Sequence, residues 1–358
     1  MSRVIRVGVV GCGEVAQIMH LPTLRDLPEL FEVVGLCDVS SRVLERVGAQ
    51  WPAARRYQDH RDLVADSAVD AVVIANPHVC HAEAALDAMN AGKHALIEKP
   101  LCVNLSEADA LIDRETKSGV TAQVGFMRRY APAFVEAVER VSALRSEVIL
   151  ARVHDVIGPN QAIIDSTSTV FRDPNVSTEL TGKLERDMAA ATALAIGPQS
   201  PDKARAYGLL LGLSSHDVSA MRELLGRPEK VLYAAQRRGG RAIAAAFDYG
   251  GYVCQFETAV DRIPHFDAHI EISTDTQIIR VDYDTPYVRH LPARLTVIDK
   301  HGPAGVSQSS SYPTRYDSFA LEWREFHRNI IEGRKPKTSI ADGREDLEIF
   351  REMIALMP

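Results

Sequence analysis

Apolar and polar positions along the first third of the chain follow two periods. Short β-branched runs, typical of buried strands, alternate with stretches whose apolar residues recur every three or four positions, as in amphipathic helices. This alternation indicates βαβ units and a parallel sheet covered on both faces. The predicted strands are residues 4–10, 31–37, 69–75, 94–97 and 120–124, and the predicted helices are 15–27, 81–91 and 106–118.

The pattern changes after about residue 125. A polar stretch at 157–186, rich in Ser, Thr, Asn and Pro, predicts a loop. Successive strands without helices between them follow, and they indicate an antiparallel sheet. The predicted strands are 147–156, 230–236, 242–248, 252–258, 266–273, 276–283 and 295–299, and the predicted helices are 131–144, 204–225, 318–332 and 341–357.

Composition narrows the class of protein. A chain of 358 residues is too long for one ordinary core and suggests two domains. A net charge of −7 argues against a nucleic-acid-binding surface, and no segment approaches the roughly 18 apolar residues of a membrane span. The first residues run directly into a strand without the pattern of a signal peptide. Five scattered cysteines without CxxC spacing fit reduced thiols, so we expect a cytoplasmic protein.

A glycine-rich turn connects the first predicted strand to the first predicted helix. In this GxGxxA motif, Gly11 permits the tight turn, Gly13 lets backbone approach a pyrophosphate, and Ala16 lets the helix close on the strand. Asp38 ends the next strand, where a carboxylate binds the adenosine ribose hydroxyls and repels a 2′-phosphate. NAD is therefore favoured over NADP, although Arg42 could reach a 2′-phosphate. The turn as a whole comprises Gly11, Cys12, Gly13, Glu14, Val15 and Ala16.

Three further motifs follow in a specific order: Asn76-Pro77-His78-Val79-Cys80-His81, then AALDAMNAGKHALIEKPL, then QVGFMRRYAPAF. With the glycine turn, this series resembles the Gfo/Idh/MocA family of oxidoreductases, the glucose–fructose oxidoreductase and inositol dehydrogenase type. The agreement is nearly continuous from residue 4 to about 134 and weaker beyond.

The resemblance implies an α/β fold with an N-terminal Rossmann domain, residues 1–126, and a C-terminal α/β domain with a mostly antiparallel open sheet. We expect the second domain at 127–335, with an insert at about 157–205, and a C-terminal helix at 336–358 that packs back on the body. The sheet often forms the oligomer interface in the family, which implies a homodimer or homotetramer.

The resemblance also implies a cofactor site. The family pattern matches the glycine turn and Asp38, and it places Asn76, Pro77 and His81 along the nicotinamide side. It matches Glu98, Lys99 and Pro100 to the EKP motif, with a cis Lys–Pro bond as in family members. We add Arg129 to the cofactor-binding residues; hinge salt bridges are the alternative for Arg128 and Arg129.

Lys99 and His216 are the expected catalytic pair. Lys99 follows a strand at the carboxyl edge of the sheet, where α/β folds bind ligands, and its ammonium can stabilise charge on a substrate oxygen. Glu98 orients the cofactor ribose or the loop. In the resemblance, His216 is the base that takes the hydroxyl proton.

This chain departs from the family pattern at Gly212, four residues before His216, where relatives often have a substrate-binding aspartate. We expect substrate contacts from Lys99, His216 and Asp155, although no spacing rule selects Asp155 from the other candidates. These are Asp165, Asp187 and Tyr207. The insert at 157–205 covers the substrate cleft, reaches a neighbouring subunit, or is peripheral.

The expected function is an NAD-dependent dehydrogenase that acts on a secondary alcohol of a sugar, sugar derivative or cyclitol. Two alternatives stay open: an NAD-retaining glycoside hydrolase, and a non-catalytic dinucleotide-binding regulator. No metal-binding spacing such as HExxH is present, and we expect no metal, nucleic-acid or membrane partner.

Overall fold

The computed structural model describes residues 3–358 and divides into two compact units. Unit 1 contains the chain up to Gly125 together with Ser168–Gly197 and Glu322–Leu347. Unit 2 contains the remaining segments, Phe126–Thr167, Pro198–Leu321 and Glu348–Pro358. Part of the expected insert and the end of the expected second domain thus group with the N-terminal unit. The units are discontinuous in sequence because the chain passes between them several times.

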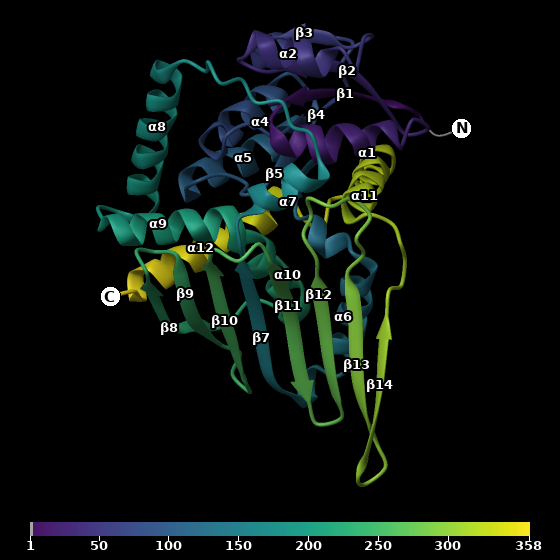
Figure 1. The fold of residues 1–358 in the computed structure, drawn as a ribbon, viewed down its shortest axis with the longest axis vertical. Helices are drawn as coiled ribbons and strands as arrows, with labels where there is room; N and C mark the ends of the chain where they lie inside the picture. Colours follow the sequence, from purple (N-terminus) through teal and green to yellow (C-terminus); the bar gives the residue numbers. More distant parts are fainter. Residues whose placement is uncertain (1–2) are drawn as a thin grey trace. The chain divides into compact units, whose positions relative to one another are not determined.

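Unit 1 is built on a parallel six-stranded sheet (Figure 1). Its strand order is β3-β2-β1-β4-β5-β6, the order of the Rossmann fold, in which the direction of winding reverses between β1 and β4. The strands are β1 (Ile5–Val10), β2 (Phe31–Cys37), β3 (Arg55–Tyr57), β4 (Ala71–Ile74), β5 (His94–Glu98) and β6 (Ala122–Gly125). The buried, β-branched character of β1 and β4 follows from coverage on both faces.

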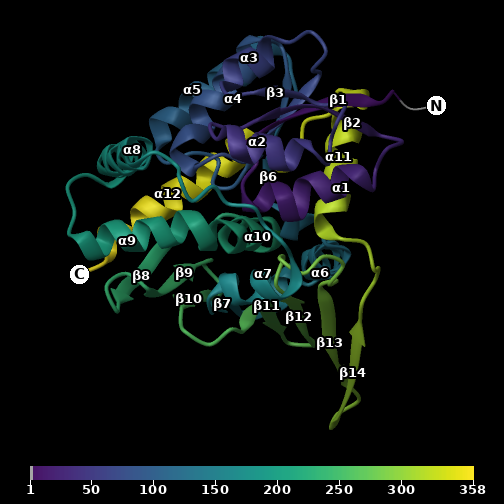
Figure 2. The ribbon, with the colours of Figure 1, turned by 45° about the horizontal axis from the view of Figure 1, so that its top comes forward.

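Helices cover this sheet, and α3, α4 and α5 lie side by side (Figure 2). The helices are η1 (Ala16–His20), α1 (Leu21–Arg25), α2 (Ser41–Gly48), α3 (His60–Ala65), η2 (His78–Cys80), α4 (His81–Asn90), α5 (Leu105–Ser118) and α8 (Thr178–Ile196). The sequence pattern did not predict α2, β3 and α3, which are short and largely polar. It also predicted a loop at 157–186, which is wrong, because α7 (Asn160–Thr167) and the first half of α8 lie there. Trp323 and Phe326 share one buried cluster with side chains of β1, α1 and α2, which ties the late segment of unit 1 to its sheet.

The start of α5 differs from the prediction. Ser106, with Asp109 three residues later, has the spacing of a capping box, so the sequence predicts Ser106 as the cap, but the N-cap is Asn104. The Asn104 side chain accepts from the Glu107 N–H at 3.0 Å, and the Glu107 carboxylate accepts back from the Asn104 N–H at 3.4 Å. The capping box is therefore real but begins two residues earlier, because Asn caps as well as Ser.

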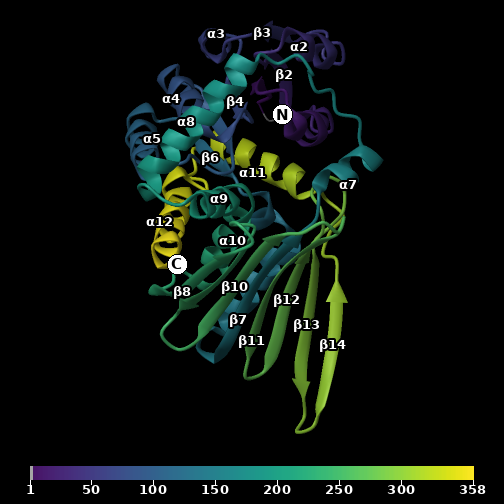
Figure 3. The same cartoon turned by 60° about the vertical axis from the view of Figure 1, so that its left-hand side comes forward.

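Unit 2 carries an eight-stranded sheet in the order β14-β13-β12-β11-β7-β10-β9-β8 (Figure 3). Only β7 and β10 pair in parallel, so the sheet is mostly antiparallel as expected. Sequence analysis missed β14, whose polar sequence lies fully exposed at the sheet edge. The strands are β7 (Val148–Ile157), β8 (Lys230–Arg237), β9 (Ala242–Asp248), β10 (Val253–Val260), β11 (Phe266–Thr274), β12 (Gln277–Tyr283), β13 (Arg294–His301) and β14 (Gly305–Ser311).

Helices α6 and α10 pack against this sheet. The expected single helix 204–225 is three segments, because a π-helical turn separates α9 from α10. The helical segments of unit 2 are η3 (Met127–Tyr130), α6 (Pro132–Ala143), η4 (Arg145–Glu147), α7 (Asn160–Thr167), α9 (Pro201–Leu209), η5 (Leu210–Ser214) and α10 (Ser215–Leu225). Helices α11 (Ser318–Glu332) and α12 (Ile340–Leu356) each contribute to both units. Within residues 3–358, no helix has the length and apolar character needed to cross a membrane.

Candidate active site

The glycine turn after β1 has the geometry of a dinucleotide-binding turn. Gly11 adopts φ +89°, and a Cβ there would lie 2.6 Å from the backbone nitrogen of Asn76, so only glycine fits. A Cβ at Gly13 would meet nothing within 4 Å, which leaves open space beside the turn. Ala16 is fully buried where the first helix closes on the sheet. These three residues meet the requirements for a bound pyrophosphate.

Asp38 lies at the end of β2, beside this turn. Its Oδ2 accepts from the Cys12 N–H at 3.0 Å, and its Oδ1 accepts from the Ser40 N–H at 2.9 Å. Burial raises the pKa of Asp38, the two backbone donors oppose the rise, and the nearby Asp173 carboxylate adds to it. The residues present therefore fit the adenosine and pyrophosphate parts of NAD.

The EKP motif is held by a buried chain of hydrogen bonds inside unit 1. The Trp323 indole N–H donates to His20 Nδ1 at 3.1 Å. Because an indole nitrogen only donates, the His20 ring proton is on Nε2, which donates to Glu98 Oε1 at 2.9 Å. Glu98 Oε2 accepts from the Lys99 N–H at 3.1 Å. Glu98 thus fixes the Lys99 peptide and supports the loop-orienting role expected for it.

The charge of Glu98 depends on these partners. Burial alone would raise its pKa, but the His20 hydrogen bond, the Lys99 charge and the Lys99 N–H together lower it below the ordinary value. Glu98 is therefore ionised at neutral pH, deep in the unit. A carboxylate at that depth needs such donors, which sequence spacing alone did not reveal.

The loop after β4 packs against the EKP turn. The two ring nitrogens of His81 face carbonyl oxygens, Nδ1 at 2.7 Å from Pro100 O and Nε2 at 2.9 Å from Asn76 O. Burial lowers the pKa of His81 although both carbonyls oppose this, and the neutral ring donates to one of them. The Lys99–Pro100 bond is cis, as expected. His81 thus joins two of the predicted motifs.

His78 is a neighbour of Lys99 to which the sequence motifs assign no role. Burial, the His81 ring and the Lys99 ammonium lower the pKa of His78 to about 3. Its ring centroid lies 5.6 Å from that of His81. The predicted cofactor residues of this loop, Asn76, Pro77 and His81, therefore share the carboxyl edge of the sheet with Lys99.

In unit 2, His216 lies in the first turn of α10 and is largely buried. The next residue, Asp217, forms an ion pair with Arg128. Arg128 also donates from Nη1 to Asp155 Oδ2 at 3.2 Å. Asp155, a predicted substrate ligand, is fully buried and neutralises Arg128 in this arrangement. Its contact with substrate stays a prediction.

Arg129 and Gly212 also have defined surroundings in unit 2. The Arg129 guanidinium donates from Nε to Glu223, so an acidic partner accounts for this buried charge, and its contact with the cofactor stays a prediction. Gly212 lies in the π-helical turn η5. A π turn has more residues per turn than an α-helix, so four residues before His216 is not one regular turn. Gly212 is therefore less certain to correspond to the aspartate position of the relatives than the spacing in the sequence implied.

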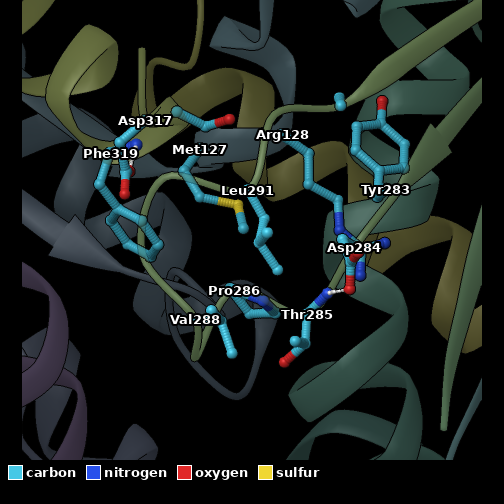
Figure 4. Close-up of a pocket in the computed structure, with 12 residues that line it drawn as sticks. Met127, Arg128, Tyr283, Asp284, Thr285, Pro286, Val288, Leu291, Asp317 and Phe319 are labelled. Atoms are coloured by element: carbon cyan, nitrogen blue, oxygen red, sulfur yellow. Dashed lines mark hydrogen bonds between the residues drawn. The ribbon is translucent and has the colours of Figure 1, made fainter. Parts of the chain in front are cut away.

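Figure 4 shows a cavity in unit 2 that sequence analysis did not identify. Arg128 lies 5.1 Å from the Tyr283 ring centroid on one side, and Asp317 lies on the other. The lining residues are Met127, Arg128, Tyr283, Asp284, Thr285, Pro286, Val288, Leu291, Ala293, Asp317, Ser318 and Phe319. Half of them come from the loop after β12, where no motif marks a site.

Among residues 3–358, no group of three or more His, Cys, Asp or Glu side chains is arranged to hold a metal ion. Unit 1 offers the Lys99 ammonium at the same sheet edge as the dinucleotide turn, and unit 2 offers the His216 imidazole and buried carboxylates. Such groups bind and orient a nucleotide and exchange protons with a polar ligand.

The fold and the glycine turn define a two-unit protein of the NAD-binding Rossmann class. Residues 5–126 match the family model described as "Oxidoreductase family, NAD-binding Rossmann fold", GFO_IDH_MocA. Residues 5–126 therefore form a domain of the Gfo/Idh/MocA oxidoreductase type. The expected fold class and the NAD-binding character of the first domain are confirmed.

Relatives and solved structures agree with this match of the N-terminal domain. An inositol 2-dehydrogenase of Salmonella paratyphi B is 35% identical over 134 residues, which cover 37% of this chain and 40% of that protein. A myo-inositol 2-dehydrogenase of Thermotoga maritima is 25% identical over 95% of this chain and 92% of its own length. The 3-ketoreductase KijD10 of Actinomadura kijaniata superposes with a TM-score of 0.75 at 20% identity, covering 99% and 98% of the two chains. At that identity the superposition shows the fold alone.

Neither alternative function receives support from these comparisons. The relatives and structures named above are dehydrogenases and a reductase, and none is a glycoside hydrolase or a regulator. The match to the Salmonella protein spans less than half of that protein, so the activity of the whole chain is a matter for proposal.

Proposed function

We propose that this protein is an NAD-dependent dehydrogenase that transfers hydride between a secondary alcohol of a sugar, sugar derivative or cyclitol and nicotinamide. The observation that carries the proposal is the position of Lys99 at the carboxyl end of β5, on the same sheet edge as the dinucleotide turn. Ligands of open α/β sheets bind at this edge, next to the reversal between β1 and β4. The inositol dehydrogenase relatives support the substrate class.

Each predicted site residue has a separate role in this proposal. Gly11 and Gly13 bind the pyrophosphate, and the Asp38 carboxylate accepts hydrogen bonds from the adenosine ribose hydroxyls. Bound NAD supplies the nicotinamide ring that accepts hydride. The Lys99 ammonium donates a hydrogen bond to the alcohol oxygen and stabilises the negative charge that develops there. His216 takes the hydroxyl proton. Glu98 keeps the Lys99 peptide in place through its contact with the Lys99 N–H.

We propose that the polar cavity in unit 2 is one end of a site for a polyhydroxylated ligand, since its own volume of about 30 Å³ has room for little more than a water. Its lining offers a guanidinium, two carboxylates and several hydroxyls, from Arg128, Asp284, Asp317, Tyr283 and Thr285. Groups of these kinds donate to and accept from adjacent hydroxyls, as a sugar or cyclitol requires. We propose that Asp155 supports the lining of this cavity by holding Arg128 in place. Arg129 has a similar supporting role through its ion pair with Glu223.

We also propose a cytoplasmic homodimer or homotetramer formed through the unit 2 sheet. All five cysteines are free, which fits a reducing compartment. One sheet face carries charged side chains on neighbouring strands, such as the exposed Arg152 on β7 opposite the half-buried Glu271 on β11. A self-complementary charged face of this kind suits a two-fold interface.

The proposed chemistry is tested with two variants and one control. Wild-type protein is first screened at 340 nm with NAD and NADP against sugars, amino sugars and inositols. On a responding substrate, Lys99→Ala should lower kcat/KM by about 100-fold or more, and His216→Asn by a similar factor. Both variants should bind NADH with a Kd within about threefold of wild type, because neither removes a group from the glycine turn.

Lys117→Ala is the matched control, since Lys117 lies exposed on α5 in a surface pair with Asp113. It should leave kcat/KM unchanged. Wild-type rates in Lys99→Ala would overturn the mechanism. Tight NADH binding without turnover on any polyol would instead favour the regulator, and release of nitrophenol from aryl glycosides would favour the hydrolase.

A further inference from the structure

Residues 168–177, which we call the strap, connect α7 to α8 and group with unit 1. The strap is anchored on the first helix by a two-point contact. The Gln17 side chain donates from Nε2 to Phe171 O at 2.9 Å, and its Oε1 accepts from the Phe171 N–H at 2.9 Å. The same Nε2 donates to Cys12 O at 2.8 Å, inside the glycine turn. The strap therefore lies directly against the dinucleotide turn.

Two charged contacts flank this anchor. Arg172 pairs with Glu14, the residue after Gly13 in the turn. On the other side, Asp173 reaches the end of β2: the Ser40 hydroxyl donates to Asp173 Oδ2 at 2.6 Å, and Arg42 donates to Asp173 Oδ1 at 3.2 Å. The Asn175 N–H also donates to Asp173 Oδ1, at 3.0 Å, which fixes the carboxylate within the strap.

Asp173 thus stands where the specificity of the adenosine ribose site is decided. Ser40 and Arg42 follow Asp38, and a hydroxyl and a guanidinium there are the groups that would bind a 2′-phosphate. In this chain both groups are directed to Asp173 instead. A 2′-phosphate carries a charge of about −1.5 to −2 at neutral pH. This phosphate would meet the carboxylates of Asp38 and Asp173. The cation that could bind it, Arg42, is already paired with Asp173.

We propose that Asp173 is a specificity-determining residue, which works with Asp38 to exclude the 2′-phosphate of NADP by holding Arg42 and Ser40 away from it. The inference deepens the proposed function, because it concerns the cofactor site of the same enzyme. It also assigns a role to the insert: the strap forms a wall of the cofactor site. Its chemistry selects NAD through a residue more than a hundred positions away from the glycine turn.

The test is a double-mutant cycle read by calorimetric binding of NADH and NADPH to the full chain. Asp173→Asn keeps the size and an acceptor for Ser40 but removes the charge. It should tighten NADPH binding by about tenfold or more while the NADH Kd stays within about threefold. Arg42→Ala in the wild-type background should change NADPH binding little, because Arg42 is occupied.

In the Asp173→Asn background, Arg42→Ala should abolish the gain in NADPH affinity, because the released guanidinium is what binds the phosphate. Glu179→Gln, on the exposed first turn of α8, is the control that removes one charge from the helix that follows the strap, and it should leave the ratio of NADPH to NADH affinity unchanged.

An unchanged ratio in Asp173→Asn with normal NADH binding would overturn the inference. Equal loss of both cofactors would overturn it too, since Asp173 would then hold the strap without discriminating. The proposed function is judged separately, by wild-type NADH binding and by turnover in the Lys99 and His216 variants. A failure here therefore leaves that test untouched.

Discussion

At the scale of single residues, the buried carboxylates show how this chain carries charge into its interior. Glu98 has donors from His20 and from the Lys99 backbone, and Asp155 and Asp217 share Arg128. Removing one partner of such a buried pair leaves an uncompensated charge, which costs far more than the intact pair contributes. The motif residues could be found in the sequence, but the partners could not, because they come from distant segments.

Asp70 provides a prediction at this scale. Its carboxylate accepts from Arg6 Nε and Nη2, both at 2.9 Å, and from the Arg6 N–H at 3.0 Å. These contacts, chiefly the side-chain hydrogen bond, lower the pKa of Asp70 to about 2. Since the folded pKa is below the ordinary value, the stabilisation is complete above about pH 4 and is lost as the pH falls towards 2.

Asp70→Asn should therefore lower the free energy of unfolding by about 1 kcal/mol between pH 5 and 8, after allowance for solvent screening. Urea unfolding at stepwise lower pH should show the gap between variant and wild type closing below about pH 4. Glu45→Gln, at an exposed position of α2, should show no such dependence. A gap that persists or widens at pH 3 would contradict the assignment.

At the scale of elements, periodicity predicted the type of most helices and strands, while their ends depended on specific side chains. The parallel strands of unit 1 read as continuous apolar runs because both faces are covered. The elements that the pattern did not predict are short or polar, so their apolar period is too weak to recognise. They are α2, β3, α3, α7, the start of α8, and β14.

The start of α5 allows a direct comparison of the predicted and observed caps. Asn104→Ala should cost about 1 kcal/mol of stability, because the Glu107 N–H loses its acceptor. Ser106→Ala, at the position that the sequence spacing predicts as the cap, should cost clearly less. Thermal and urea unfolding of the two variants measure the difference. A larger loss of stability in Ser106→Ala would contradict Asn104 as the cap of α5.

At the scale of the whole molecule, the central question is self-association. We expect light scattering to give the mass of a dimer or tetramer. Arg152→Glu, which reverses an exposed charge on the sheet face proposed as the interface, should weaken association at least about tenfold. Arg140→Glu, on α6 outside the sheet, is the control and should leave the mass unchanged. A monomeric wild-type protein at micromolar concentration would refute the proposed interface.

The sequence by itself determined the Rossmann unit, the glycine turn with Asp38, the EKP motif and the antiparallel character of the second sheet. These depend on local period, on backbone needs that only glycine meets, and on motifs in a set order. Tertiary structure alone decided that residues 168–197 and 322–347 join unit 1, that Trp323 and His20 support Glu98, and that Asp173 holds Arg42. Such pairings link positions far apart in the chain, and only the packing of one segment on another brings their side chains within reach.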